Sequence, residues 1–336
     1  MSRGAVCFSV LFCVAQFSYS LRAQDQGAQS EREPTVSITS RTRTIEPGAD
    51  TVVDRRVDLR IDTSLVLIPV VVTDPKGRVI TGLERENFRL LEDKVEQKIA
   101  QFSREDVPVS VGVVFDTSGS MSDKLQISQL AVAQFLRTAN PDDEFFLIEF
   151  NNRPKLTVPF TSESEKLQSR LMLTRAKGGT ALLDAVDLAM REMKKARNGR
   201  KAILIISDGG DNSSRYTERE VRSAVIEGDV QIYAIGIFGG FGTGFLTAEE
   251  MAGPFLLSDL AERTGGRHFA GNRLAELPEV AAKIGLQLRN QYLLAYKPTN
   301  NARDGKFRRV MVKLAKPAGM PPLKTTSRTG YYAPTH

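Results

Sequence analysis

Apolar residues in the middle of the chain follow two alternating patterns. Continuous apolar runs lie at 109–115, 145–150, 202–206 and 231–237. Between and after them, apolar residues recur every three or four positions, which is typical of amphipathic helices. The helices predicted in this way lie at 127–135, 182–193, 257–263 and 277–288. Strands that are apolar on both faces indicate a sheet covered by helices on both sides. The alternation therefore predicts an open, mostly parallel α/β sheet over residues 108–288.

Both flanks of this region have the texture of antiparallel β structure. The first flank, 59–107, begins with the β-branched and aliphatic run at 64–72, and the second, 289–336, alternates with period two at 309–314. Neither flank is long enough to bury a good core alone. We therefore expect the flanks to pair into one β-sandwich, with a Rossmann-like α/β domain inserted between them. Two separate flanking hairpins are the alternative.

Two further helices are predicted from their N-terminal signatures. Ser162-x-x-Glu165 and Thr217-x-x-Glu220 both have the form of a capping box. In this motif the hydroxyl accepts a hydrogen bond from the backbone N–H three residues on, and the Glu side chain bonds back to the cap residue. Both motifs therefore predict a helix that begins directly after the hydroxyl residue.

The N-terminus has the pattern of a secretory signal. A cationic start, the apolar run Ala5–Phe17 and small residues up to Ser20 predict a signal peptide over 1–20. The run is shorter than the ~20 residues that a membrane-spanning helix needs. Cleavage would leave a chain without a membrane span, and an uncleaved anchor is the alternative. Residues 21–58 are polar and aperiodic, which predicts a flexible linker. We expect export to the periplasm, the cell surface or the medium.

Composition narrows the possible chemistry. The chain has 336 residues, 41% of them hydrophobic, and a formal net charge of +6, which fits a globular protein with ordinary solubility. Its two cysteines, Cys7 and Cys13, lie inside the predicted signal, and its two histidines are His268 and His336. These counts exclude a Cys/His zinc site and a multi-histidine metal site. No nucleic-acid-binding motif is present, so we expect no nucleic-acid partner.

Oxygen-bearing side chains gather where the predicted strands end. The first strand runs into Asp116, Ser118 and Ser120, the strand 202–206 is followed by Asp208, and Thr180 precedes a predicted helix. Ligands of open α/β sheets bind beyond the carboxyl ends of the strands. Carboxylate and hydroxyl oxygens are hard ligands that suit Mg²⁺, or Mn²⁺ or Ca²⁺, better than zinc or copper. A cation held by neutral hydroxyls stays under-neutralised, so it should recruit an acidic oxygen from outside.

The set Asp116-x-Ser118-x-Ser120, Thr180 and Asp208 resembles the metal-ion-dependent adhesion site of von Willebrand factor type A domains. The likeness covers about 108–288. It implies that Ser118, Ser120 and Thr180 bind the metal directly and that Asp116 and Asp208 act through water. It also implies a non-catalytic binding or adhesion module, whose protein partner presents an Asp or Glu carboxylate to the metal. The flanking β segments and the secretory start resemble secreted bacterial proteins that carry this domain.

Alternative interpretations stay open from the sequence. A metal-assisted hydrolase could use Asp116 or Ser118 at the same strand ends, although Ser118 stands where a second carboxylate would be expected. His268 is the internal histidine that could act as a general base. Ser118, Ser120 or Thr180 could instead cap a helix. The glycine-rich stretch 236–244 does not match Gly-x-Gly-x-x-Gly and so does not predict a dinucleotide site. The oligomeric state is open.

Overall fold

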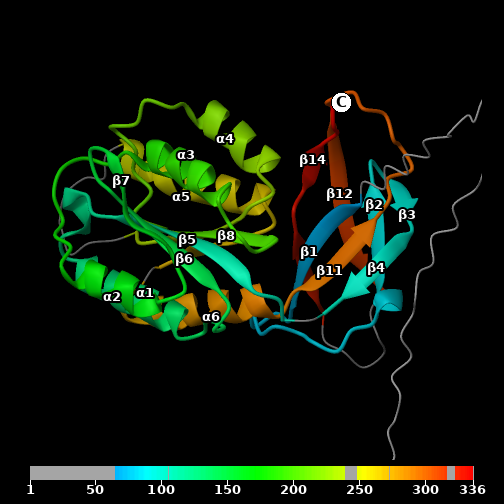
Figure 1. Cartoon of the computed structure of the whole chain (residues 1–336), viewed down its shortest axis with the longest axis horizontal. Helices are drawn as coiled ribbons and strands as arrows, with labels where there is room; N and C mark the ends of the chain where they lie inside the picture. The colour runs from blue at the N-terminus through cyan, green and yellow to red at the C-terminus, as the bar shows by residue number, and fades with distance from the viewer. Residues whose placement is uncertain (1–64, 105, 239–247, 272, 316–321, 336) are drawn as a thin grey trace, which may run out of the picture. The chain divides into compact units, whose positions relative to one another are not determined.

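In the computed structural model, the continuous apolar runs form the strands of a six-stranded sheet. Its order is β10-β9-β8-β5-β6-β7, and all neighbouring strands are parallel except β6 and β7. The strands are β5 (Val109–Asp116), β6 (Glu144–Phe150), β7 (Pro154–Thr161), β8 (Arg200–Ser207), β9 (Gln231–Gly236) and β10 (His268–Ala270). Every residue of β5, β6 and β9 is buried. The open, mostly parallel sheet predicted from the sequence is confirmed (Figure 1).

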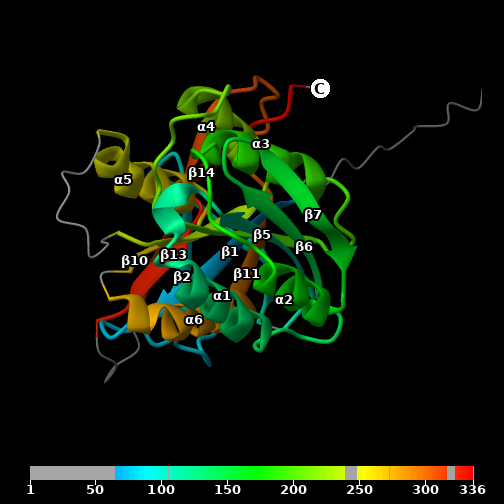
Figure 2. The ribbon, with the colours of Figure 1, turned by 90° about the vertical axis from the view of Figure 1, so that its left-hand side faces the viewer.

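Helices cover both faces of this sheet. Side chains alternate along a strand, so Val113 of β5 packs on one face and Val114 on the other. The first face is covered by α1 (Leu125–Leu136), α2 (Ser164–Met172) and α6 (Leu277–Arg289). The second is covered by α3 (Leu182–Met193), α4 (Glu218–Glu227) and α5 (Ala248–Arg263). Figure 2 shows these two helical layers below and above the sheet.

The two flanks of the chain form a β-sandwich, as predicted. One antiparallel sheet has the order β13-β1-β11-β4 and the other β14-β12-β2-β3. The first flank supplies β1 (Val66–Thr73), β2 (Phe88–Glu92), β3 (Val95–Gln97) and β4 (Ile99–Ser103). The second supplies β11 (Tyr292–Tyr296), β12 (Phe307–Leu314), β13 (Lys324–Ser327) and β14 (Gly330–Tyr332). Ile68 of β1, Leu90 of β2 and Val312 of β12 share one core.

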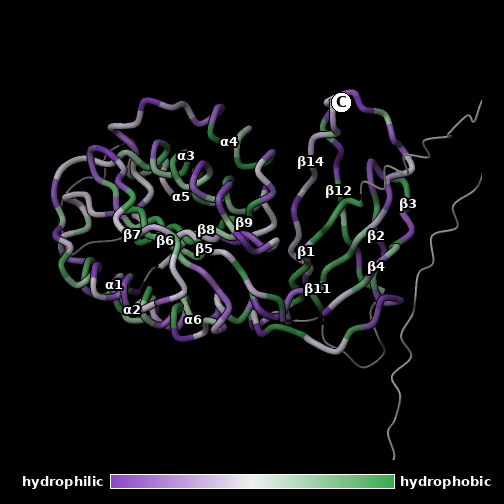
Figure 3. Tube along the Cα trace, viewed as in Figure 1, coloured by the Kyte–Doolittle hydropathy of each residue, from purple (hydrophilic) through white to green (hydrophobic). Residues whose placement is uncertain are grey.

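The structure describes residues 65–104, 106–238, 248–271, 273–315 and 322–335, all within the unit Arg60–His336. The predicted signal 1–20 and linker 21–58 lie outside the described residues. Among the described residues, no helix is both long and apolar enough to cross a membrane. Figure 3 shows hydrophobic residues along the strands and hydrophilic residues in the loops.

Three short 3₁₀ turns complete the secondary structure: η1 (Arg85–Asn87), η2 (Gly119–Met121) and η3 (Leu274–Glu276). Of the two predicted capping boxes, the one at Thr217 is confirmed, since Thr217 accepts from Glu220 N and Glu220 bonds back. The one at Ser162 is wrong. The Thr161 hydroxyl accepts a hydrogen bond from Glu163 N at 3.1 Å, and this local bond makes Glu163 the residue before the helix.

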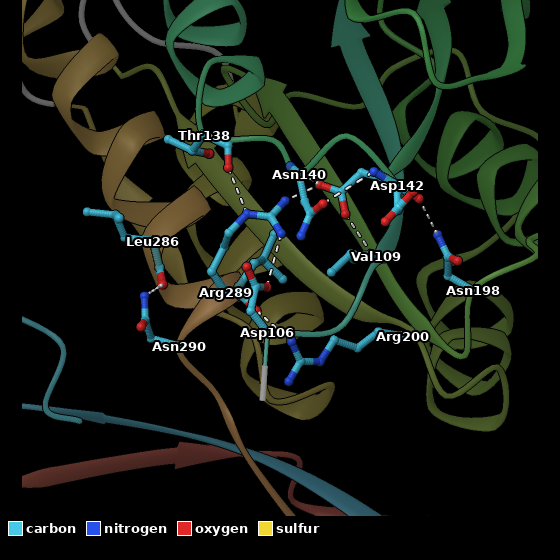
Figure 4. A network of polar contacts seen from close by, with 12 residues as sticks. Asp106, Val109, Thr138, Asn140, Asp142, Asn198, Arg200, Leu286, Arg289 and Asn290 are labelled. Atoms are coloured by element: carbon cyan, nitrogen blue, oxygen red, sulfur yellow. Dashed lines mark hydrogen bonds and ion pairs between the residues drawn. The ribbon is translucent and has the colours of Figure 1, made fainter. Parts of the chain in front are cut away.

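Ion pairs and hydrogen bonds close the amino ends of the strands (Figure 4). Asp143, which precedes β6, accepts from Val109 N at 2.8 Å and pairs with Arg289 at the end of α6. Arg289 also donates from Nε to the Thr138 carbonyl at 2.7 Å and pairs through Nη1 with Asp106 at 3.1 Å. The end of α6 is thus joined to the start of β5 and to the loop after α1.

Glu144 belongs to a second polar cluster at the same end. Its carboxylate accepts from Ser110 Oγ at 2.6 Å and from Arg197 N and Nε at 2.6 and 2.7 Å. Burial acts to raise the pKa of Glu144, but these hydrogen bonds and the Arg197 charge outweigh burial and lower the pKa. The charged carboxylate is therefore the form that the fold favours.

Candidate metal centre

The two predicted aspartates follow neighbouring strands. β5 and β8 pair in parallel, with Phe115 opposite Ile206, so that Asp116 and Asp208 lie at the same edge of the sheet. Asp116 is fully buried and Asp208 is 5% exposed. Since both strands are inner strands of a fixed ladder, the fold holds these two carboxylates at adjacent strand ends.

Backbone hydrogen bonds join the loop that carries Thr180 to both aspartate loops. Gly119 N donates to the Gly178 carbonyl at 2.9 Å. On the other side, Asn212 N donates to the Thr180 carbonyl at 3.0 Å, and Thr180 N donates to Asn212 Oδ1 at 2.9 Å. Gly178 has a φ of +81°, a conformation that favours glycine. The structure therefore brings together the three chain segments that carry the five predicted residues.

The three hydroxyls are not used as helix caps. Ser118 precedes η2 but makes no side-chain capping bond, and its Oγ lies 3.1 Å from Ser120 Oγ. The residue that precedes α3 is Ala181, not Thr180. Thr180 is 4% exposed, and its hydroxyl makes no hydrogen bond within the described part of the chain. The capping interpretation is therefore wrong for Ser118 and Thr180, and their oxygens are available to a ligand.

Asp116 is the electrostatically strained member of the site. It accepts hydrogen bonds from Ser118 N at 2.8 Å and from Ser207 Oγ at 2.5 Å. These bonds do not offset burial, the larger influence, and the nearby Asp208 charge, which together raise the pKa of Asp116 to about 7. A cation near both carboxylates would relieve this repulsion.

Lys124 is a member of this site that the sequence analysis missed. It lies just before α1, is 7% exposed, and its Nζ is 3.4 Å from Asp208 Oδ2. A lysine at a helix N-terminus opposes the helix dipole, and this mismatch is the signal that could have revealed it. Lys124 supplies part of the positive charge that the two carboxylates require, and it directs one oxygen of Asp208.

Asp211, downstream of Asp208, has a structural role. Its Oδ2 accepts from Leu183 N, in the first turn of α3, at 2.8 Å and from Ser214 Oγ at 2.7 Å. Asp211 thus satisfies an amide at the start of α3 and fixes the loop beside Thr180.

The available oxygens fit a hard divalent cation. Ser118, Ser120 and Thr180 offer neutral oxygens, and Asp116 and Asp208 offer negative charge beside them. No cluster of three or more His, Cys, Asp or Glu side chains occurs in the described ranges, so no carboxylate- or imidazole-saturated site competes there. These five residues would hold the ion.

His268 is not placed to act as a base at this site. It lies on β10, and the strands β9 and β8 separate it from β5. At about 4.8 Å between neighbouring strands, its strand is roughly 14 Å from that of Asp116. Burial lowers the pKa of His268, and its ring packs against Phe238 with 5.6 Å between centroids. The structure gives it a packing role at the far side of the sheet.

Comparison with known proteins identifies the α/β region. Residues 111–210 match the family model of the von Willebrand factor type A domain. Mouse inter-alpha-trypsin inhibitor heavy chain 4 is 30% identical over 174 residues, which are 46% of this chain and 18% of that protein. An uncharacterized protein of Borreliella burgdorferi is 24% identical over 183 residues, 50% of this chain and 52% of that protein. The chain thus spans about half or less of the length of these relatives.

A solved structure of von Willebrand factor type A from Catenulispora acidiphila is also similar. It is 13% identical with a TM-score of 0.49, and the match covers 81% of this chain and 76% of that one. The family match includes most of β5 and all of α3 and β8, and therefore all three segments that meet at the strand ends. The chain contains a von Willebrand factor type A domain.

Proposed function

We propose that this chain is an exported, non-catalytic binding protein that captures an acidic side chain of a partner protein through a divalent cation at the strand ends. Mg²⁺ is the expected ion, with Mn²⁺ and Ca²⁺ as alternatives. Asp116, Ser118, Ser120, Thr180 and Asp208 are the proposed metal site. The export part of the proposal rests on the signal pattern at 1–20.

One observation carries this proposal. Three segments distant in sequence are hydrogen-bonded to one another and gather two buried aspartates and three hydroxyls at one edge of the sheet. The Thr180 hydroxyl lacks a partner in the described chain, and Lys124 is the one side chain there that pairs with Asp208. A hydroxyl without a protein partner is open to water or to a ligand, and the Thr180 hydroxyl lies in the loop that is hydrogen-bonded to both aspartate loops.

Each residue has a distinct part in the proposed capture. Ser118, Ser120 and Thr180 offer oxygens without adding negative charge. Asp116 and Asp208 would act through water and supply the negative charge that attracts the cation. When bound, the divalent cation supplies a positive centre that attracts a carboxylate. Because the hydroxyls are neutral, the protein leaves positive charge for the partner's Asp or Glu to neutralise.

Calorimetric titration with MgCl₂ tests the metal site. We expect wild type to give binding heat and Asp116→Asn to bind at least ~10-fold more weakly, since the amide keeps the shape but lacks the charge. Asp142→Asn is the matched control, because Asp142 is exposed and its side chain forms no ion pair in the described structure. Equal heats from wild type and Asp116→Asn would contradict the proposed site.

A further inference from the structure

A basic hollow adjoins the candidate metal centre. It has a volume of about 580 Å³ and lies between β7, the end of α2 and the loop that leads to Thr180. Its lining includes five cationic side chains, Arg153, Lys155, Arg170, Arg175 and Lys177, and one carboxylate, Glu149. The hollow therefore carries a strong positive charge.

Four of these cations are free to meet a ligand. Arg153, Lys155, Arg175 and Lys177 are all exposed, and none of them forms an ion pair within the described part of the chain. Elsewhere in the α/β region, Arg197 pairs with Glu144 and Arg222 pairs with Asp259. Four unpaired cations around one concavity form a surface complementary to negative charge.

The one carboxylate of the hollow is already satisfied. Glu149 is 6% exposed and pairs with Arg170 Nη2 at 2.6 Å. It also accepts a hydrogen bond from the Thr174 hydroxyl. Arg170 therefore neutralises the charge of Glu149. The four exposed cations, which we call the rim of the hollow, keep their positive charge for an external partner.

The hollow and the metal centre share a wall. Thr117 lines the hollow and stands between Asp116 and Ser118 in the chain. Lys177 N donates to the Thr117 carbonyl at 2.8 Å, so a rim residue is hydrogen-bonded to the metal loop itself. An extended peptide advances ~3.3–3.6 Å per residue, so a segment bound at the metal reaches the rim within a few residues.

Apolar side chains lie next to the cations. Met172 and Leu173, at the end of α2, are 79% and 74% exposed, and Leu173 lines the hollow. Exposed large apolar residues beside charged ones are typical of protein-binding surfaces. This combination favours a protein segment over a purely anionic polymer.

We infer that the basic hollow binds a second acidic residue of the same partner segment whose first carboxylate meets the metal. The partner is then a protein with an acidic stretch that carries several Asp or Glu residues. This inference rests on the proposed function and adds the chemical class of the partner. The metal centre requires one carboxylate in the partner segment. The cations of the hollow favour segments that carry further Asp or Glu residues beside it.

Two synthetic peptides separate the two contributions. One carries a single Glu among Gly and Ser, and the other carries six Glu, both with blocked ends. Calorimetry of the whole protein with Mg²⁺ should show the six-Glu peptide binding at least ~10-fold more tightly, and 0.5 M NaCl should remove most of that gain. The double variant Arg153→Glu/Lys177→Glu should lose the gain and keep both Mg²⁺ binding and single-Glu binding.

A matched control has the same change in net charge. Arg89→Glu/Lys313→Glu reverses two exposed cations that face each other on β2 and β12 of the sandwich, and should bind both peptides like wild type. Circular dichroism shows whether the charge reversal impairs folding. If it does, the milder Arg153→Ala/Lys177→Ala replaces it in the test and should lose part of the gain in affinity.

The outcomes distinguish the two levels of the proposal. If wild type gave no heat of Mg²⁺ binding, the proposed function would be overturned. An unchanged six-Glu affinity in both hollow variants, or no six-Glu binding by wild type, would overturn the acidic-segment inference alone. Tighter binding to anionic phosphatidylglycerol vesicles than to the six-Glu peptide, with chelator present, would assign the hollow to a lipid surface and also overturn it.

Discussion

The two ends of the central sheet bury carboxylates in opposite ways. At the amino end, Glu144 is 2% exposed, and its hydrogen bonds with Ser110 and Arg197 lower its pKa. At the carboxyl end, Asp116 is fully buried with two hydrogen bonds, and burial with the neighbouring Asp208 raises its pKa to about 7. Both are strand-terminal acids in one sheet, yet the fold stabilises the charge of the first and disfavours the charge of the second.

This difference separates a structural role from a binding role. Polar groups whose partners come from the same chain, such as Asp143 and Arg289, stabilise the fold and leave nothing for a ligand. Asp116, whose charge is disfavoured by burial and by Asp208, costs stability in the metal-free protein, and the Thr180 hydroxyl without a protein partner is open to a ligand. Whether a buried polar group finds its hydrogen-bond and ion-pair partners within the chain is thus a better indicator of a binding role than how deeply it is buried.

The largest expected effect comes from breaking the amino end. Asp143→Ala removes one of the two carboxylates that pair with Arg289, and it removes two hydrogen bonds from backbone groups, Val109 N and Asn140 N. We expect the free energy of unfolding to fall by about 3–5 kcal/mol, since two backbone N–H groups each lose their acceptor and the half-buried Arg289 keeps only Asp106 as an ion-pair partner. Urea unfolding measures this, with the exposed neighbour variant Asp142→Ala changing by less than about 0.5 kcal/mol. Equal losses in both variants would contradict the comparison.

A smaller effect is expected from pH at the carboxyl end. The folded pKa of Asp116, about 7, lies above its ordinary value of 3.8, so the folded metal-free protein binds this proton more tightly than the unfolded chain. The associated stability is full below pH ~4 and is lost as pH rises through ~7. In chelator, Asp116→Asn should therefore gain roughly 2–3 kcal/mol relative to wild type between pH 5 and pH 8.

Urea unfolding of both proteins at the two pH values measures this difference. Saturating MgCl₂ should reduce it, because the cation replaces the proton as the partner of the two aspartates and stabilises wild type alone. A difference between wild type and Asp116→Asn that does not change with pH would show that the Asp116 charge is not strained.

The smallest effect is expected at Lys124. Its ion pair with Asp208 gives the carboxyl end of the sheet one carboxylate that is paired within the chain, as Glu144 and Asp143 are at the amino end. Lys124→Met removes the ammonium 3.4 Å from Asp208, and Mg²⁺ then no longer competes with it. We expect about 3–10-fold tighter Mg²⁺ binding by calorimetry, equivalent to roughly 1 kcal/mol. Lys283→Met, on the exposed surface of α6, is the control and should not change the affinity. Weaker binding in Lys124→Met would show that the lysine supports the metal site.

Sequence patterns predicted the elements where one physical signal dominates. β5 is mostly apolar because both of its faces are buried, and Thr217 is a true cap because both halves of its capping box form. α5 begins earlier than the predicted 257–263. Gly253 and Pro254 lie inside the helix and interrupt its sequence pattern, so the pattern predicted only the part after them. Local competition by the Thr161 hydroxyl defeated the Ser162 box.

The candidate site was predictable only in its oxygen atoms. Asp116, Thr180 and Asp208 were found because they follow predicted strands or precede a helix, where topology brings chain segments together. Lys124 and the basic hollow were missed because a search for metal ligands passes over cations. The hollow also depends on β7 and the α2–α3 loop lying beside Thr117, which no local pattern encodes.

The position of β1 determines how the molecule would respond to mechanical tension. β1 lies between β11 and β13, so a pull on the chain ahead of Val66 loads hydrogen bonds along both edges of an inner strand in shear. These bonds must yield together and not one by one. Because β11 follows α6 directly, force would pass from β1 through β11 to the α/β domain. The domain would then stay folded while a partner bound at the strand ends is pulled against the N-terminal side of the chain.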